Sequence, residues 1–178
     1  MLLKKNNVLN TLVTSKTRVR LLVKFFINVA NKGYLRGLAE EFDESTNSIR
    51  KELNNLSEAG YLNKVTIQNR ISYNANTQHP LFETLQKLVF HYLGLPTIIE
   101  MIVERMGIVE QIYIIGDYAR GIDSGTIEVI IVGPQLDKQY LNQLEGKIEK
   151  EIERKVRFIA TSNYKDKGLL IYEAKLLS

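Results

Sequence analysis

LRGLAEEFDESTNSIRKELNNLSEAGYL, residues 35–62, decides the fold of the first half of this chain. Apolar residues recur in it at the spacing of one helix face, first over residues 35–42 and again over residues 46–62. The first set is Leu35, Leu38, Ala39 and Phe42, and the second is Ile49, Leu53, Leu56 and Leu62. Between the two sets lie residues that favour turns and helix starts, Asp43, Ser45, Thr46 and Asn47. The stretch predicts two short helices joined by a tight turn.

The flanking segments extend this pattern to a winged helix. Residues 16–31 read as a longer helix, with Ser15 as N-cap and Gly33 as a stop signal. After Gly60, residues 62–67 and 70–75 read as two strands joined by a polar turn at Gln68 and Asn69. Residues 1–14 read as a loosely held arm or a short helix.

The outward face of the second short helix carries amides, a hydroxyl and cations, with no acid before Glu52. Such a face suits the negatively charged major groove, where Arg50 would fork to guanine and Asn47 or Asn54 to adenine. Cations near the start of the 16–31 helix, Arg20 among them, and in the hairpin would contact phosphates. The predicted DNA-binding residues are Ser45, Thr46, Asn47, Ser48, Arg50, Lys51, Asn54, Arg70, Lys16 and Arg18. Each of these alone is more often a solvated surface residue, and it is their arrangement that indicates an interface.

Composition and charge agree with this interpretation. Residues 1–93 contain 13 Lys and Arg against 7 Asp and Glu, whereas residues 94–178 contain 11 against 13. The basic excess therefore coincides with the predicted DNA-binding half. The chain has no cysteine, which excludes disulfides and thiolate metal sites and fits a cytoplasmic location. The N-terminus does not resemble a signal peptide, and no apolar run approaches a membrane span.

The second half alternates strands with helices. We expect helices at 81–94, 98–106 and 136–154, strands at 111–115, 127–132 and 156–160, a glycine-rich loop at 116–125, and a strand or helix at 169–177. Gly94 and Pro96 interrupt the helical spacing of apolar residues that begins at residue 81. We therefore expect a domain boundary at this point, with domains 1–94 and 95–178. The predicted fold class is α+β, a winged helix-turn-helix domain followed by a small mixed-sheet α/β domain.

Residues 16–93 resemble the ArsR-type winged-helix regulators. The resemblance lies in YLRGLAEEFDESTNSIRKELNNLSEAGYL, residues 34–62, and in NRISYNAN, residues 69–76. It implies a homodimer that binds palindromic double-stranded DNA. Many members sense metals through cysteine or histidine clusters, but this chain offers only His79 and His91, for which we expect structural or surface roles. We expect no metal site and no cofactor.

GDYARGIDSGTIEVIIVG, residues 116–133, is similar to the active-site region of the nucleotidyltransferase fold. Gly116, Tyr118, Ala119, Arg120 and Gly121 match the family pattern, whereas Asp117 stands at its serine position. The family's Asp-x-Asp pair, which holds the divalent metals, falls on Thr126 and Glu128, and Arg157 lies where a third acid is expected. We therefore expect no catalytic residues here and a domain kept for sensing or assembly. A weak nucleotide or phosphate site at Gly116, Arg120, Gly121 and Glu128 stays open, beside the simpler interpretation that the glycines only shape a turn.

These observations lead to one main hypothesis and two alternatives. The main one is a cytoplasmic, homodimeric, sequence-specific transcriptional regulator without enzymatic activity. One alternative is a nucleotidyltransferase that recruits its target through the winged helix. The other is a protein-interaction module, which the polar face of residues 46–54 disfavours because such faces usually become apolar. The best dimerisation candidates are the 16–31 helix and residues 81–93.

Overall fold

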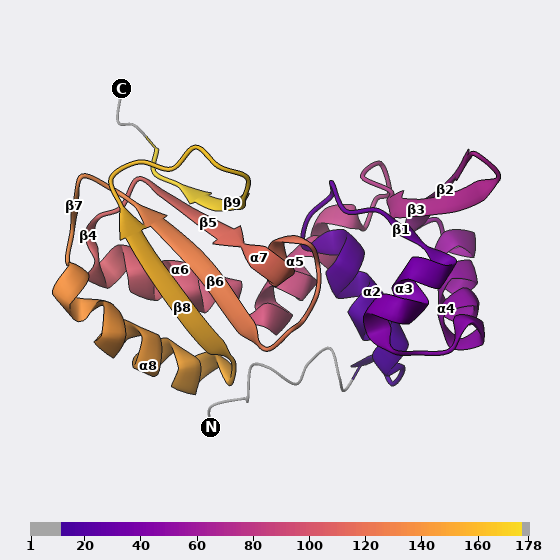
Figure 1. The fold of residues 1–178 in the computed structure, drawn as a ribbon, viewed down its shortest axis with the longest axis horizontal. Helices are drawn as coiled ribbons and strands as arrows, with labels where there is room; N and C mark the ends of the chain where they lie inside the picture. Colours follow the sequence, from indigo (N-terminus) through magenta and orange to yellow (C-terminus); the bar gives the residue numbers. More distant parts are fainter. Residues whose placement is uncertain (1–11, 176–178) are drawn as a thin grey trace. The chain divides into compact units, whose positions relative to one another are not determined.

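Residues 12–175 are described by a computed structural model of the chain, and Figure 1 traces their helices and strands. They divide into two units, which are considered separately below. The N-terminal unit contains residues 12–90 together with 120–122, and the C-terminal unit contains residues 91–119 and 123–175. Among the helices of the described residues, none has the length and apolar character needed to span a bilayer.

The N-terminal unit combines helices with a small antiparallel sheet. Its elements are α2 (Lys16–Phe26), β1 (Gly33–Tyr34), α3 (Leu35–Phe42), α4 (Thr46–Glu58), β2 (Leu62–Ile67), β3 (Arg70–Ala75) and most of α5 (Phe82–Leu93). The three strands lie in the order β1-β3-β2. The unit is thus mixed α and β, as expected.

The two predicted short helices and the turn between them are present, and of the two predicted capping residues Ser45 is the cap whereas Thr46 is the first residue of α4. Asp43 ends α3 in the left-handed conformation, with φ 52°, and the Ser45 side chain caps α4 by accepting a hydrogen bond from the Ser48 N–H. The apolar faces of the two helices meet in a core in which Leu38, Ile49 and Leu53 are at most 1% exposed. Burial of such side chains stabilises each by about 1.5–3 kcal/mol relative to exposure. Leu62 is also buried, but it is the first residue of β2 and not part of α4.

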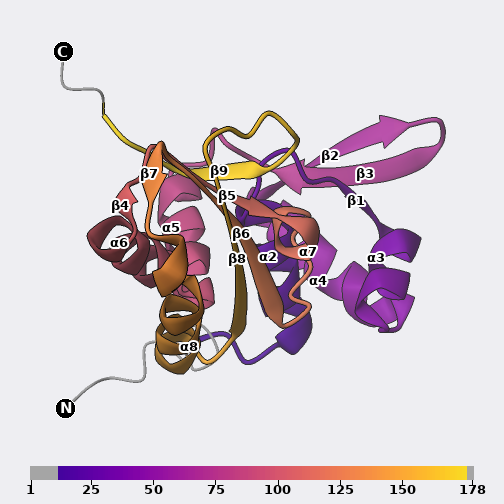
Figure 2. The ribbon, with the colours of Figure 1, turned by 60° about the vertical axis from the view of Figure 1, so that its left-hand side comes forward.

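The hairpin has the predicted strands and turn. Gln68 and Asn69 both have positive φ, 47° and 61°, as a two-residue hairpin turn requires. This turn sets a register in which Ile67 faces Arg70 and Lys64 faces Tyr73. Figure 2 shows the hairpin lying above α3.

The first long helix is shorter than predicted. It ends at Phe26, and Val29, which lies within the predicted helix, is 45% exposed. Two asparagines explain the early stop. The Asn31 amide donates to the Lys24 carbonyl at the end of the helix, and the Asn28 side chain accepts from the Ala30 N–H. Both bonds compete with continued helix, as asparagine side chains commonly do.

The C-terminal unit is built on a four-stranded sheet. Its elements are α6 (Leu95–Arg105), β4 (Gly107–Ile108), β5 (Gln111–Ile115), α7 (Gly116–Ala119), β6 (Thr126–Val132), β7 (Gln135–Leu136), the 3-10 helix η2 (Lys138–Tyr140), α8 (Leu141–Ile152), β8 (Lys155–Thr161) and β9 (Leu169–Glu173). The sheet order is β8-β6-β5-β9, with β6 and β8 parallel and the other neighbours antiparallel. The predicted mixed sheet is confirmed.

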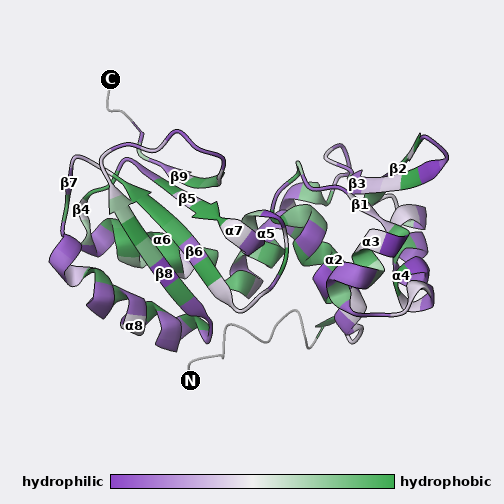
Figure 3. Ribbon diagram, in the orientation of Figure 1, coloured by the Kyte–Doolittle hydropathy of each residue, from purple (hydrophilic) through white to green (hydrophobic). Residues whose placement is uncertain are grey.

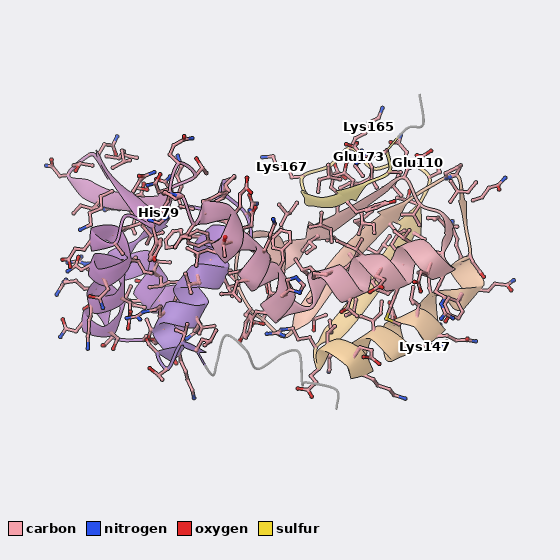
Figure 4. All side chains as sticks on the ribbon, turned by 180° about the vertical axis from the view of Figure 1, so that it is seen from behind. His79, Glu110, Lys147, Lys165, Lys167 and Glu173 are labelled. Atoms are coloured by element: carbon pink, nitrogen blue, oxygen red, sulfur yellow. The ribbon has the colours of Figure 1, made fainter. Side chains whose placement is uncertain are left out.

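One face of this sheet is covered by helices. Helix α8 packs on β8 and α6 packs on α8, and Figure 1 shows both helices on the same side of the sheet. The strands are strongly apolar and α8 is polar on its outer side (Figure 3). That outer side carries Lys147, whose ammonium lies 2.6 Å from the Tyr140 hydroxyl (Figure 4).

Three boundaries in this unit differ from the expectation. Helix α6 begins at Leu95 because Pro96 falls in its first turn, where no backbone N–H is needed. Helix α8 begins at Leu141, after β7 and η2, whose Asp137 side chain caps the 3-10 turn. The loop expected at 116–125 opens with the short helix α7. The last segment is a strand over Leu169–Glu173, and residues 176–178 lie outside the described part of the chain.

Strand β8 lies at one edge of the sheet, and its outer side is occupied by carboxylates of α8. Glu149 accepts a hydrogen bond from the Val156 N–H at 2.9 Å, and Glu145 accepts one from the Phe158 N–H at 2.7 Å. Backbone donors that an edge strand would otherwise offer to another chain are therefore satisfied internally.

Candidate nucleic-acid interface

The outward face of α4 is polar and accessible. Thr46, Asn47, Ser48, Arg50 and Lys51 are exposed, and Asn54 is half-buried. The Arg50 guanidinium donates to the Asn47 side chain at 3.2 Å. This bond restrains an otherwise flexible side chain and leaves the rest of its guanidinium fork available.

A groove with a volume of about 840 Å³ lies beside this face. We call it the α3–α4–hairpin groove, because residues from all three elements line it: Tyr34, Leu35, Arg36, Gly37, Glu40, Arg50, Asn54, Lys64, Asn69, Arg70, Ile71 and Tyr73. Four of these residues are cationic and one is acidic. A concave surface with such an excess concentrates positive potential, which attracts phosphate groups.

The structure brings together three of the predicted DNA-binding residues in this groove, Arg50, Asn54 and Arg70. It adds Arg36, Lys64, Tyr34 and Tyr73, which the sequence analysis did not single out. For two of these residues, Arg36 and Lys64, the sequence contains a feature that could have indicated their place in the site. Arg36 lies on the polar face of the predicted 35–42 helix, and Lys64 is the cross-strand partner of Tyr73 in the predicted hairpin.

The predicted cations of α2 lie elsewhere. Lys16 is exposed at the start of that helix and does not line the groove. Arg18 is engaged in an ion pair, with its Nε 2.7 Å from the Glu52 carboxylate on α4. The next two cations of the helix are paired in the same way, Arg20 with Glu44 at 2.9 Å and Lys24 with Glu41 at 2.8 Å. These bridges link α2 to α3, α4 and the turn between them, and they engage Arg18 and Arg20, two of the side chains that we assigned to phosphates.

Two groups of this unit have shifted pKa values. Burial raises the pKa of the Tyr73 phenol, while the nearby Arg50 charge opposes that shift. Burial also acts to raise the pKa of Glu52, but hydrogen bonds from Ser15 and Arg18 and the Arg18 charge outweigh it, so the pKa of Glu52 lies below its ordinary value. At neutral pH, Tyr73 is therefore a protonated donor and Glu52 an anion.

The second candidate region centres on Gly116 and Glu128. Glu128 on β6 faces Ile115 on β5 and Arg157 on β8 across the sheet. A Cβ on Gly116 would lie 2.1 Å from the Glu128 carboxylate, and Gly116 has φ 66°, a backbone conformation that favours glycine. Gly116 and Glu128, which the sequence analysis assigned to one site, therefore lie next to each other in the structure.

This region does not fit the metals that the nucleotidyltransferase resemblance implies. Beside Glu128 it offers the hydroxyl of Thr126 and the guanidinium of Arg157, and a cation in place of a third acid opposes binding of a divalent metal. Within the described residues, no three His, Cys, Asp or Glu side chains are grouped as a metal site requires.

The four predicted nucleotide-binding residues do not fall in one unit. Gly116 and Glu128 belong to the C-terminal unit, whereas Arg120 and Gly121 belong to the N-terminal unit. There Gly121, with φ 76°, lies against the backbone of Lys24, and an added Cβ would be 2.5 Å from the Lys24 Cα. Close packing therefore accounts for this glycine.

Tyr118, another residue of the family pattern, is a structural anchor. Its ring is fully buried, and its hydroxyl donates to Asp123 and accepts from the Gly125 N–H at 3.1 Å. Asp123 is paired with Arg154, which also donates to the Tyr92 carbonyl at 3.1 Å. Burial and the bond to Asp123 raise the pKa of Tyr118 far above its ordinary range, so it does not ionise.

Neither histidine lies in the groove. His79, labelled in Figure 4, packs against Tyr61 with 4.6 Å between ring centroids and the rings tilted by 59°, and its Nδ1 accepts from the Leu81 N–H. His91 is exposed in the last turn of α5.

No protein-family model matches this sequence, and no curated protein is similar to it. Among solved structures, the chain is similar to the crystal structure of the AntR antimony-specific transcriptional repressor, with 22% sequence identity and a TM-score of 0.35, over 52% of this chain and 76% of that one. A likeness of this size carries no conclusion about fold or ligand.

Proposed function

We propose that residues 1–94 form a winged-helix domain that binds double-stranded DNA, and that the chain is a cytoplasmic, homodimeric, sequence-specific transcriptional regulator. The observation that carries this proposal is the α3–α4–hairpin groove, where Arg50, Arg70, Lys64 and Arg36 converge from three elements. The element order also supports it: helix, strand, two helices and a two-stranded hairpin follow one another in the order of a winged helix.

In this proposal α4 is the recognition helix. Arg50 forks to a guanine edge, and Asn54 or Asn47 pairs with adenine. Asn47 has the further task of orienting Arg50 through their hydrogen bond. The neighbouring polar residues of this face contact the DNA backbone beside these bases; they are Thr46, Ser48 and Lys51. Ser45 fixes the start of the helix by capping it.

The hairpin and α2 supply the backbone contacts. Arg70 at the hairpin turn and Lys64 beside it contact phosphates or the minor groove. Lys16, exposed at the start of α2, is the α2 cation that we retain for a phosphate contact.

We further propose that residues 95–178 form an inactive nucleotidyltransferase-like domain that serves sensing or assembly. The support is chemical. A two-metal transfer needs at least a pair of carboxylates, and the position beside Gly116 offers Glu128 opposite Arg157.

Fluorescence anisotropy of labelled duplex DNA at two salt concentrations tests the DNA proposal. Saturable binding that weakens steeply with salt is expected. Arg50→Ala should relax specificity and cost about 1–3 kcal/mol on the preferred site. Lys87→Ala, which removes an exposed cation outside the groove, is the matched control and should leave specificity unchanged. Absence of saturable binding, or equal effects of the two variants, would refute the proposal.

The enzymatic alternative has its own test. Incubation with labelled nucleoside triphosphates, magnesium or manganese, and candidate protein acceptors should give no transfer. Label transfer that disappears in Glu128→Gln would establish a nucleotidyltransferase and overturn our assignment of the C-terminal domain.

A further inference from the structure

The first turn of α3 opens into the α3–α4–hairpin groove. Its residues Tyr34 to Gly37 line the groove, and the N-cap residue Tyr34 makes no side-chain capping bond. The first N–H groups of a helix have no partner within the helix, and together with the helix dipole they favour an anion. No other part of the described structure lies within 4 Å of where a Cβ of Gly37 would be, so the space beside this residue is open.

A tyrosine hydroxyl lines the same space. Tyr73 lines the groove although it is only 6% exposed, and its phenol has no hydrogen-bond partner among the described residues. Its ring is packed away while its hydroxyl stays accessible to the groove, so the hydroxyl is free to bond a ligand there. Since Tyr73 is protonated at neutral pH, it would donate to an anionic oxygen.

The charges and the size of the groove narrow the ligand class. Arg36, Arg50, Lys64 and Arg70 surround the space against one acid, Glu40. The volume of about 840 Å³ falls within the range of about 300–1,000 Å³ that is typical of small-molecule sites. Tyr34 and Ile71 are 40% and 46% exposed, and they offer apolar surface against which a planar ring could lie.

We propose that this groove is a binding site for a phosphate ester of mononucleotide size, with its phosphoryl group at the first turn of α3, where Arg36, Arg50 and the Tyr73 hydroxyl complete its coordination. A phosphate of duplex DNA carries the same chemistry, so the free ester and the duplex exclude each other. The proposal of an anion site depends only on the residues of the groove. The proposal that the ester competes with DNA rests in addition on the proposed function. A soluble phosphorylated metabolite would then release the regulator from DNA.

The test uses the full-length protein with AMP, inorganic phosphate and adenosine as probes, at constant ionic strength. Isothermal titration calorimetry should show saturable binding of AMP, weaker binding of phosphate and none of adenosine. Tyr73→Phe removes one hydroxyl and should weaken AMP binding about tenfold, as expected for a lost hydrogen bond to a charged group. Lys64→Gln should also weaken it, whereas Lys87→Gln, an equal change of charge outside the groove, should not.

A second arm separates the two sources of phosphate. AMP is added to labelled duplex bound to the protein, and displacement by AMP but not by adenosine is expected. If AMP and phosphate fail to bind, or bind equally well to Tyr73→Phe that retains the wild-type melting temperature, the anion site is refuted. If AMP binds but no duplex does, the anion site is supported and the DNA function is refuted. If both bind without displacement, the competition is wrong.

Discussion

At the scale of single residues, Glu52 links the recognition helix to the rest of its unit. It lies on the inner side of α4, is 6% exposed, and accepts a hydrogen bond from Arg18 at 2.7 Å. Burial opposes ionisation of this carboxyl, yet bonds from Ser15 and Arg18 lower its pKa below the ordinary value of 4.5. The unfolded chain therefore binds the proton more tightly than the folded chain does.

This difference predicts how stability depends on pH. The contribution of Glu52 to the free energy of unfolding is complete above its unfolded pKa and is lost as the pH falls through its lower folded pKa. Glu52→Gln should remove that dependence and destabilise the protein at neutral pH by about 1–3 kcal/mol, since Arg18 loses its charged partner. Urea denaturation from neutral pH to below 4.5 measures both effects.

Glu58→Gln is the control for this prediction, because it removes an exposed carboxyl of the same helix. If its stability profile between neutral and acidic pH matches that of Glu52→Gln, the burial and bonding of Glu52 have no thermodynamic effect and the prediction is wrong.

At the scale of elements, helix α8 protects the edge of its sheet. Replacing Glu145 and Glu149 by Ala leaves the N–H groups of Phe158 and Val156 without acceptors. Each lost bond should cost about 0.5–1.5 kcal/mol, and the exposed edge should promote strand pairing between copies. Sedimentation velocity should show association beyond that of the wild type, and thermal unfolding should show the destabilisation. Glu151→Ala removes an exposed acid from the same helix and should do neither; an equal effect would show that net charge is the cause.

Elements with a local cause could be predicted from the sequence. The hairpin strands and the turn at Gln68 and Asn69 follow from alternation and from residues that tolerate positive φ, and the start of α4 follows from its Ser45 cap. The end of α2 could not be predicted, because it depends on Asn31 bonding back to the Lys24 carbonyl. Short strands such as β4 and β7 escape detection because their two residues carry no periodicity.

The part of the candidate site that has a local cause could also be predicted from the sequence. Helical periodicity predicted the outward face of α4, whereas the groove depends on how three elements meet. Arg18 illustrates the limit: in the sequence it reads as a free cation, and its acidic partner is 34 residues away. Arg36 and Lys64 have signals in the sequence, but those signals do not show that the two residues meet in one groove.

At the scale of the whole molecule, the proposed homodimer makes a stoichiometric prediction. Two chains should bind one palindromic duplex, because each copy presents one recognition helix to one half-site. Sedimentation equilibrium of the protein and titration of labelled duplex above its dissociation constant should both report two chains. A duplex of equal length with one half-site scrambled is the control and should bind more weakly; one chain per intact duplex would contradict the dimer.

The two-residue turn of the hairpin constrains how this protein can change over evolutionary time. Side chains alternate between the two faces of a strand, so the register fixed by Gln68 and Asn69 decides that Lys64, Ile71 and Tyr73 share the groove. Loss or gain of one residue there would turn the opposite set of side chains inward. Descendants of this gene can therefore acquire new ligand preferences by point substitution, but insertions and deletions in the turn should be purged by selection.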